Sequence, residues 1–193
     1  MPPAPAAGPP GASPFDRLGA DVVAGLRRRL ADQRRLAEVA LAQVPDAAYT
    51  ARLGPLDPLG VQVKHVAGSL RSRFTGFLTA DGEKDDRDRD AEFELTPDDT
   101  RAALTARWDA AWDLADRQIA ALTPEDLGRT VTVRGEPMLA LDALHRALGH
   151  AAYHTGQIVL LAKHAAGDAW QTLSVPRGGS RAYTAEVRAR FAR

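Results

Sequence analysis

Three histidines are the residues whose type and spacing point most directly to chemistry. His150 and His154 stand four residues apart in a long stretch of helical apolar periodicity. One turn of an α-helix places such a pair on the same face, where two neutral imidazole nitrogens can hold one divalent cation. His65 lies far upstream, in another stretch of helical periodicity. If the fold brings His65 beside the pair, the sequence predicts a three-histidine metal site with room for water or substrate.

Small residues surround these histidines and allow two interpretations. Glycine inside a helix costs about 1 kcal/mol relative to alanine, so Gly149 and Gly156, on either side of Ala152, need a reason. Space for a ligand would supply one, and close approach of a neighbouring helix would supply another. Ala67 and Gly68, near the upstream histidine, favour the same two interpretations.

Other chemistries fit the sequence less well. The zinc-protease pattern needs glutamate directly after its first histidine, where this chain has Ala151. A di-iron centre needs paired Glu-x-x-His motifs, and the chain offers only Asp142 three residues before His145. There is no cysteine, which excludes thiolate ligands, cysteine nucleophiles and disulfides. Bis-histidine haem stays open on geometry alone. His164 is expected to be an ordinary histidine near a helix end, and Tyr153 receives no catalytic role.

Composition narrows the class of protein further. The 193 residues suit one domain with a sizeable core, and the formal net charge of zero draws the chain neither to nucleic acid nor to an anionic membrane. No apolar run approaches the roughly 20 residues of a membrane span. Residues 1–14 are almost all Pro, Ala and Gly and lack the pattern of a secretory signal. We therefore expect a disordered tail over 1–14, a single domain over 15–193 and a cytoplasmic protein.

Apolar periodicity and capping signals predict four long helices. They are expected from Phe15 to about Val44, from Asp57-Pro58 onward, from Thr96 for about 25 residues, and from about Pro137 to Ala166. The densely charged stretch Asp81–Glu94 predicts a long acidic loop between the second and third helices.

Shorter elements complete the pattern. Thr123–Asp126 predicts a brief turn, and the alternation in Thr130–Val133 predicts a strand, with Arg134–Glu136 closing a small hairpin before the fourth helix. A last helical turn or two is expected within Tyr183–Arg190. The predicted fold class is all-α, a four-helix bundle.

Several blocks of the sequence resemble the DinB-like (YfiT-like) superfamily of metal-binding helical bundles. They are His65–Phe74, continued by Phe77–Lys84, and His150–Ile158. Within it, Arg87–Glu94 and Leu173–Gly178 resemble a branch catalogued only as a domain of unknown function. The resemblance covers nearly everything after the Pro-rich tail.

The resemblance implies an up-down-down-up bundle with a metal, zinc or nickel, held by His65, His150 and His154. It also implies a small thiol cosubstrate activated by the cation for transfer to an electrophile, and a homodimer. Two departures stand out. Ser69 occupies a position where this branch usually has asparagine. Lys64 replaces a typical apolar residue and is expected to point to solvent.

Two functional classes follow and stay open. The first is a metal-dependent thiol S-transferase, or a hydrolase acting through metal-bound hydroxide. The second is a stress-associated bundle without turnover, in which the metal is structural. Arg71 and Arg73 are candidates for binding the carboxylates of a thiol cosubstrate. Asp90 and Glu92, in the acidic loop, are candidates for accepting a hydrogen bond from a histidine ring N–H, unless that loop is simply solvated.

Overall fold

The computed structural model of the protein describes residues 13–192. The disordered tail predicted over residues 1–14 therefore lies almost wholly outside the described residues. Of its last two residues, Ser13 is the N-cap of the first helix and Pro14 is the first residue of that helix. The side chain of Ser13 accepts a hydrogen bond from the backbone of Asp16 and caps the helix, and Pro14 occupies the first helical position.

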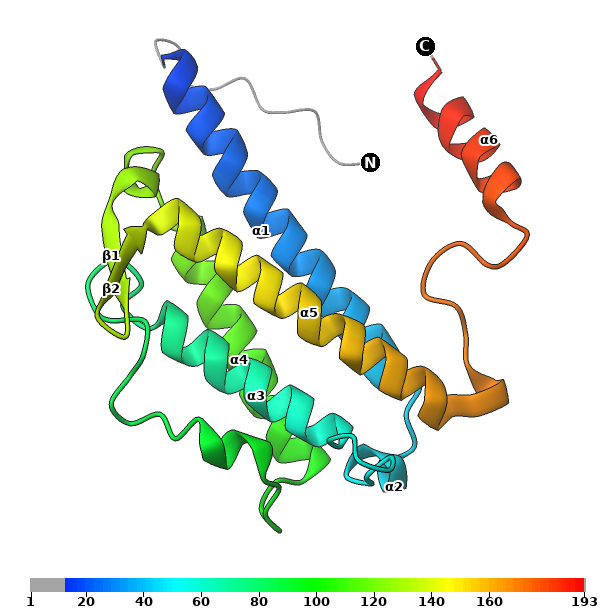
Figure 1. Cartoon of the computed structure of the whole chain (residues 1–193). Helices are drawn as coiled ribbons and strands as arrows, with labels where there is room; N and C mark the ends of the chain where they lie inside the picture. The colour runs from blue at the N-terminus through cyan, green and yellow to red at the C-terminus, as the bar shows by residue number, and fades with distance from the viewer. Residues whose placement is uncertain (1–12, 193) are drawn as a thin grey trace.

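The described chain consists of helices and one short hairpin (Figure 1). In chain order the elements are α1 (Pro14–Leu41), α2 (Asp46–Tyr49), α3 (Leu59–Phe74), the 3₁₀ turn η1 (Asp90–Phe93), α4 (Arg101–Ala120), the 3₁₀ turn η2 (Glu125–Gly128), β1 (Thr130–Val133), β2 (Glu136–Leu139), α5 (Ala140–Ala166), the 3₁₀ turn η3 (Gly167–Ala169) and α6 (Ser180–Phe191). The all-α expectation is confirmed, and so is the small hairpin before the helix that carries His150 and His154.

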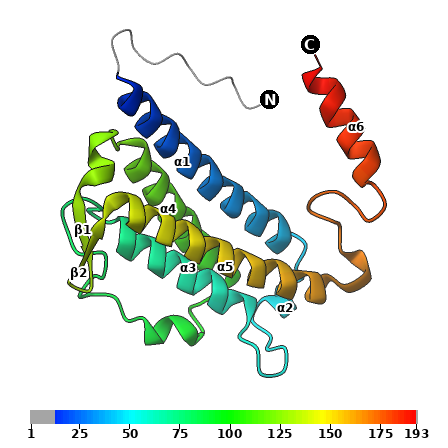
Figure 2. The ribbon, with the colours of Figure 1, turned by 45° about the horizontal axis from the view of Figure 1, so that its top comes forward.

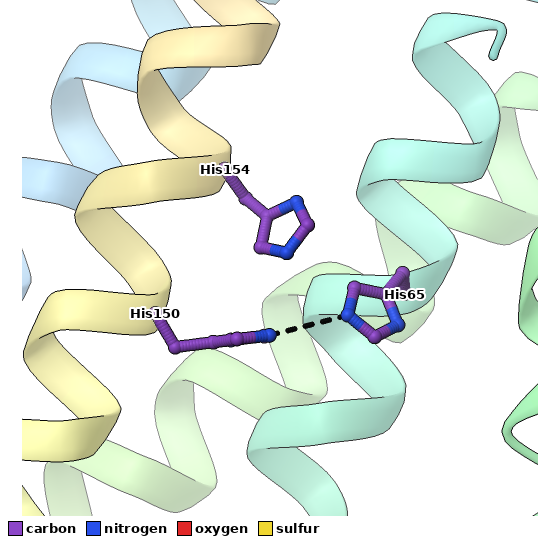
Figure 3. A group of neighbouring side chains, drawn as sticks. All are labelled: His65, His150 and His154. Carbon is purple, nitrogen blue, oxygen red and sulfur yellow. Dashed lines mark hydrogen bonds between the residues drawn. The ribbon is translucent and has the colours of Figure 1, made fainter.

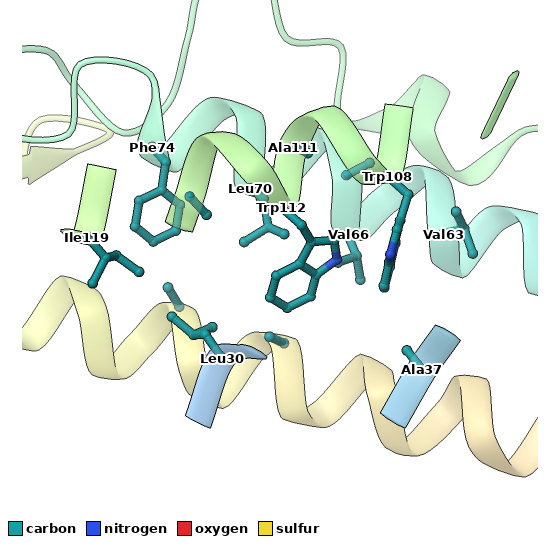
Figure 4. Close-up of a cluster of buried hydrophobic side chains, with 14 of the residues drawn as sticks. Leu30, Ala37, Val63, Val66, Leu70, Phe74, Trp108, Ala111, Trp112 and Ile119 are labelled. Carbon is teal, nitrogen blue, oxygen red and sulfur yellow. The ribbon is translucent and has the colours of Figure 1, made fainter. Parts of the chain in front are cut away.

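The long helices α1, α3, α4 and α5 pack side by side (Figures 1 and 2). Helix α3 contacts both α4 and α5, and α1 contacts both α5 and α4. Each contributes an apolar stripe at helical spacing, such as Leu26, Leu30 and Ala37 on α1. Figure 4 shows how side chains from different helices, among them Trp112 and Phe74, share one core.

The predicted starts of α4 and α5 are wrong. In each case the residues at the predicted start form other hydrogen bonds or strand pairs instead of the first helical turn. Thr96 donates its backbone N–H and its hydroxyl to Asp99 in a turn, and Thr100 caps α4 instead. Pro137 pairs with Thr132 in the hairpin, so α5 begins only at residue 140. Strand pairing thus takes the residues that the sequence pattern assigns to the first turn of that helix.

The other boundaries differ less from the prediction. Helix α1 ends at Leu41, three residues before Val44, and Pro58 rather than Asp57 is the N-cap of α3. Helix α6 is longer than predicted, and none of its residues is buried. Figure 1 shows it apart from the four long helices. Among the helices of residues 13–192, none is both long enough and apolar enough to cross a membrane.

The acidic loop holds the hairpin turn in place. Arg134 and Gly135 form a two-residue turn with φ angles of 58° and 75°. Among residues 13–192, Arg134 is the only residue other than glycine with φ in this left-handed region. Asp81 accepts hydrogen bonds from the backbone N–H groups of Glu83, Gly135 and Arg134. These bonds hold the pKa of Asp81 well below its usual range. The loop and the hairpin are therefore one connected structure beside α3.

The core makes a simple prediction about stability. Leu104 on α4 is 0% exposed, so Leu104→Ala should lower the free energy of unfolding by about 2–5 kcal/mol through lost burial and the cavity it leaves. Leu160 on α5 is 66% exposed, and Leu160→Ala should change the same quantity by less than about 0.5 kcal/mol. Urea denaturation followed by circular dichroism measures both, and equal losses would contradict the packing described.

Candidate metal centre

Helices α3 and α5 bring the three histidines together. His65 projects from α3 toward His150 and His154 on α5 (Figure 3). One nitrogen of each ring lies within 4.8 Å of the corresponding nitrogens of the other two. His65 and His154 are buried and His150 is partly buried. The three histidines therefore lie close enough to bind one metal ion.

Hydrogen bonds behind two of the rings orient them toward a shared space. The Nδ1 atom of His65 lies 2.8 Å from Oε2 of Glu92, and the Nδ1 atom of His154 lies 2.8 Å from Oε1 of Gln62. An ionised carboxylate and an amide oxygen can only accept, so both Nδ1 atoms donate. A neutral imidazole that carries its proton on Nδ1 has its lone pair on Nε2. The Nε2 atoms of both rings therefore carry the lone pairs that can bind a cation.

The spacing of the nitrogens fits a divalent cation. Nε2 of His65 lies 3.2 Å from Nε2 of His150. Two nitrogens bound tetrahedrally at 2.0–2.1 Å from a zinc ion would be about 3.3 Å apart. At such a distance two lone pairs repel unless a proton or a cation lies between them. Imidazole nitrogens suit zinc and nickel, and three of them leave a coordination position open.

The surroundings keep two of the rings neutral at neutral pH. Burial lowers the pKa of His150 to about 4, helped by the neighbouring charges of His154, His65, Arg73 and Arg87. Burial likewise lowers the pKa of His154 to about 4. The neutral form is the one that binds metals, so the lone pairs are available without competition from protons.

A buried arginine fixes the carboxylate behind His65. Arg87, whose side chain is 3% exposed, donates through Nε and Nη2 to the two carboxylate oxygens of Glu92, both at 2.8 Å. Burial raises the pKa of Glu92, but the hydrogen bonds from His65 and Arg87 outweigh it and hold the pKa below its usual value. Glu92 therefore stays ionised and remains an acceptor for the ring.

The other candidate residues fall in different places. The side chain of Asp90 is fully exposed, and within the described part of the chain its ion-pair partner is Arg89, at 4.0 Å. The structure does not bring Asp90 to a histidine. Arg71 is half exposed and forms an ion pair with Asp86. Arg73 does line the space beside the histidines. Its side chain is mostly buried.

A cavity of about 220 Å³ lies against His65 and His150. Its apolar side is formed by residues of α3, of the segment after α3, and of β1, among them Phe74, Phe77 and Val133. Its remaining wall is rich in arginine. The cluster thus has adjoining space in which a small molecule could reach the open coordination position.

Gly68 on α3 is the glycine near the histidines that the structure requires, rather than either glycine of α5. A Cβ atom on Gly68 would lie 2.0 Å from Oε1 of Glu92, so only glycine lets this carboxylate approach α3. Gly149 and Gly156 are exposed, and among residues 13–192 a Cβ on either would meet nothing within 4 Å. The interpretation that these two glycines admit a neighbouring helix is therefore wrong, and neither of them lines the cavity beside His150.

Sequence reasoning missed two residues and misplaced a third. Gln62 hydrogen-bonds the ring of His154 directly, and Arg87 acts on His65 through Glu92. Of the two, Gln62 could have been noticed in the sequence, as a polar residue one turn before His65 on the apolar face of α3. Lys64 does not point to solvent, because Nζ donates to Oδ2 of Asp99 at 2.8 Å and its side chain is only 14% exposed. Burial raises the pKa of Asp99, but hydrogen bonds from Lys64 and a threonine outweigh it and hold the pKa at about 2.

Gly68→Ala tests whether the position of Glu92 matters to the centre. The added methyl group should displace Glu92 from His65 and weaken zinc binding by about 10–100-fold, the usual cost of losing a ligand's hydrogen-bond partner. Gly156→Ala is the matched control. It should leave zinc affinity unchanged and raise the free energy of unfolding by up to about 1 kcal/mol. Calorimetric zinc titration separates the two outcomes, and equal affinities in both variants would contradict the role given to Glu92.

The metal-free protein should lose stability as the pH falls from 6.5 to about 4. In this window the unfolded histidines, with an ordinary pKa of 6.5, bind protons that folded His150 and His154, with pKa values of about 4, do not. Urea denaturation of chelator-treated protein across this range measures the slope. Combined replacement of both by Gln should flatten it, whereas His145→Gln, at an exposed position of the same helix, should not. An unchanged slope in the double variant would show that these rings are not held neutral.

No curated protein and no solved structure matches this chain. A family match does cover most of it, from residue 17 to residue 179. The matched region runs from α1 to the loop before α6 and contains all three histidines. The chain therefore belongs to the family described as protein of unknown function DUF1572.

Proposed function

We propose that the protein binds one zinc or nickel ion through His65, His150 and His154 and uses it as a metal-dependent transferase with a small thiol cosubstrate. The observation that carries the proposal is the convergence of three ring nitrogens within 4.8 Å, beside a cavity of about 220 Å³. A structural site would use all its positions for protein ligands, whereas three histidines leave one open. An open position next to free space favours chemistry over a purely structural role.

The side chains have defined parts in such a reaction. A bound dication lowers the pKa of a thiol or of water and supplies a nucleophile near neutral pH. Glu92 and Gln62 hold two of the rings in the orientation that exposes Nε2. The apolar side of the cavity, around Phe74 and Phe77, excludes water from the substrate. In the transfer, the thiol proton leaves to solvent, sulfur forms a bond to the electrophilic carbon, and the leaving group departs with the bonding electron pair.

The chain itself cannot supply the thiol, since it has no cysteine. The nucleophile must therefore be a separate small molecule or water. With water, the same arrangement would make the protein a hydrolase.

A structural role for the metal is the second candidate. The ligands come from α3 and α5, so a cation would tie two long helices together. In that case the metal would raise the stability of the bundle without any turnover.

The proposal also includes what the family resemblance implies beyond the family itself. We place the chain in the DinB-like superfamily, with an up-down-down-up bundle and a homodimeric state. Light scattering of the purified protein measures the oligomer, independently of the metal.

Metal content and turnover test the proposal together. Protein purified without chelator should carry one zinc or nickel ion per chain by mass spectrometry of the metals. After stripping, zinc at 100 times its dissociation constant should stabilise the fold by about 2.7 kcal/mol. His154→Ala should abolish both effects. His145→Ala should retain them, because His145 is an exposed histidine on the same helix.

Turnover then separates the two candidates. Incubation with small thiols and a chromogenic electrophile should give metal-dependent product that His154→Ala loses. A fully occupied site without product for any thiol, combined with a large loss of stability on metal removal, would establish the structural role instead. A chain that binds no divalent metal in any preparation would contradict both.

A further inference from the structure

The cavity beside the histidines has a strongly positive wall. Five arginines line it: Arg73, Arg87, Arg89, Arg134 and Arg146. Among the described residues, no aspartate or glutamate lines it. The five arginines come from α3, the acidic loop, the hairpin turn and α5, so four separate parts of the chain contribute guanidinium groups to one cavity.

Acidic side chains beside the cavity neutralise only part of this charge. Glu83 accepts hydrogen bonds from Arg73, Arg87 and Arg134, and Glu92 accepts from Arg87. These two carboxylates face five guanidinium groups. The wall therefore keeps a surplus of positive charge that a bound anion would balance.

The remaining two arginines keep their hydrogen-bonding capacity. Within residues 13–192, Arg146 approaches Glu136 only at 3.9 Å and Arg89 approaches Asp90 only at 4.0 Å, both beyond hydrogen-bonding distance. Both acids are mostly exposed, so these contacts are weak ion pairs in solvent. A guanidinium group with free donors suits bidentate recognition of a carboxylate or phosphate.

The positions of these arginines suit a ligand that also reaches the histidines. Arg146 stands one helical turn before His150 on α5, on the same side of the helix. The hairpin turn that Asp81 holds carries Arg134 to the cavity in a left-handed backbone conformation. An anion on these side chains would therefore lie beside the candidate metal position.

The apolar lining limits the rest of the ligand. Phe74, Phe77, Val131 and Val133 line the same cavity as the arginines and give it apolar surface. The volume of about 220 Å³ is comparable to the roughly 150 Å³ of an apolar cavity that binds one benzene molecule. The part of the ligand inside the cavity is therefore small and has an apolar body.

From these observations we propose that the cavity is a binding subsite for a small organic oxyanion, with its carboxylate or phosphate held by Arg146 and Arg89 and its apolar body against Phe77 and Val133. The claim that the bound oxyanion is the substrate rests on the proposed function. The claim that the cavity binds an oxyanion does not. The substrate class is thus an organic acid or phosphate ester whose reacting carbon is directed toward His150.

Small aromatic probes test the subsite on the full-length protein. Benzoate represents the carboxylate source, phenyl phosphate represents the phosphate source, and benzyl alcohol is the neutral control of similar size. Calorimetric titrations are run on the zinc-loaded and on the metal-stripped protein. At least one of the two anions should bind at least about tenfold more tightly than benzyl alcohol in both forms, because each charged hydrogen bond contributes that much. Whichever of the two anions binds more tightly shows whether the natural ligand carries a carboxylate or a phosphate.

Matched variants locate the binding. Arg146→Gln and Arg89→Gln should each weaken binding of the preferred anion by about tenfold or more, while Arg28→Gln, an exposed arginine of α1, should not. Zinc affinity and melting temperature should be unchanged in the two cavity variants, which shows that they are folded. Equal binding of anions and alcohol, or equal binding by Arg146→Gln, Arg89→Gln and Arg28→Gln, would overturn the subsite.

These outcomes separate the two proposals. Histidine-dependent zinc binding without arginine-dependent anion binding would overturn the subsite and leave the metal centre standing. Arginine-dependent anion binding in a chain that never binds zinc would support the subsite and contradict the proposed function.

Discussion

The hydrogen bond between His65 and Glu92 is the interaction on which the candidate centre depends. It fixes the proton on Nδ1 of the ring and thereby turns the lone pair of Nε2 toward His150, 3.2 Å away. Glu92 can do this only while it is ionised inside the protein, and a buried carboxylate pays a large desolvation cost. The paired donors of Arg87 offset that cost. The geometry of the centre therefore depends on an ion pair contributed by the loop between α3 and α4.

The fold accommodates this arrangement through a few specific residues. Gly68 lets the carboxylate approach the helix that carries His65. Asp81 connects the same loop to the hairpin by accepting hydrogen bonds from its turn. Helix α5 then places His150 and His154 against α3, with Gln62 orienting the second of them. Helices, loop and hairpin thus converge on one side of the bundle, where the cavity lies.

Much of this could be predicted from the sequence, because helical periodicity is a local property. The helix content, the hairpin and the shared face of His150 and His154 all follow from spacing and capping rules. Residue type made His65 a third ligand only on the condition that the fold brings it to the pair. The family resemblance was needed to expect that convergence, since no rule relates residues 85 positions apart. The starts of α4 and α5 were not predictable from caps alone, because the Thr96–Asp99 turn and the pairing of Pro137 compete with the helix. Arg87 looked like one more charge in a solvated loop, and only the folded chain shows it buried against Glu92. The close helix approach predicted at the glycines of α5 was wrong for a related reason. The sequence shows that a residue is small, but not whether a neighbouring element occupies the space beside it.

X-ray absorption of the zinc-loaded protein tests the central claim most directly. The account predicts three imidazole nitrogens at about 2.0–2.1 Å from the metal, completed by a solvent ligand. It also predicts that His65→Ala reduces the imidazole count. A coordination shell made of oxygen ligands, or one that His65→Ala leaves unchanged, would contradict it.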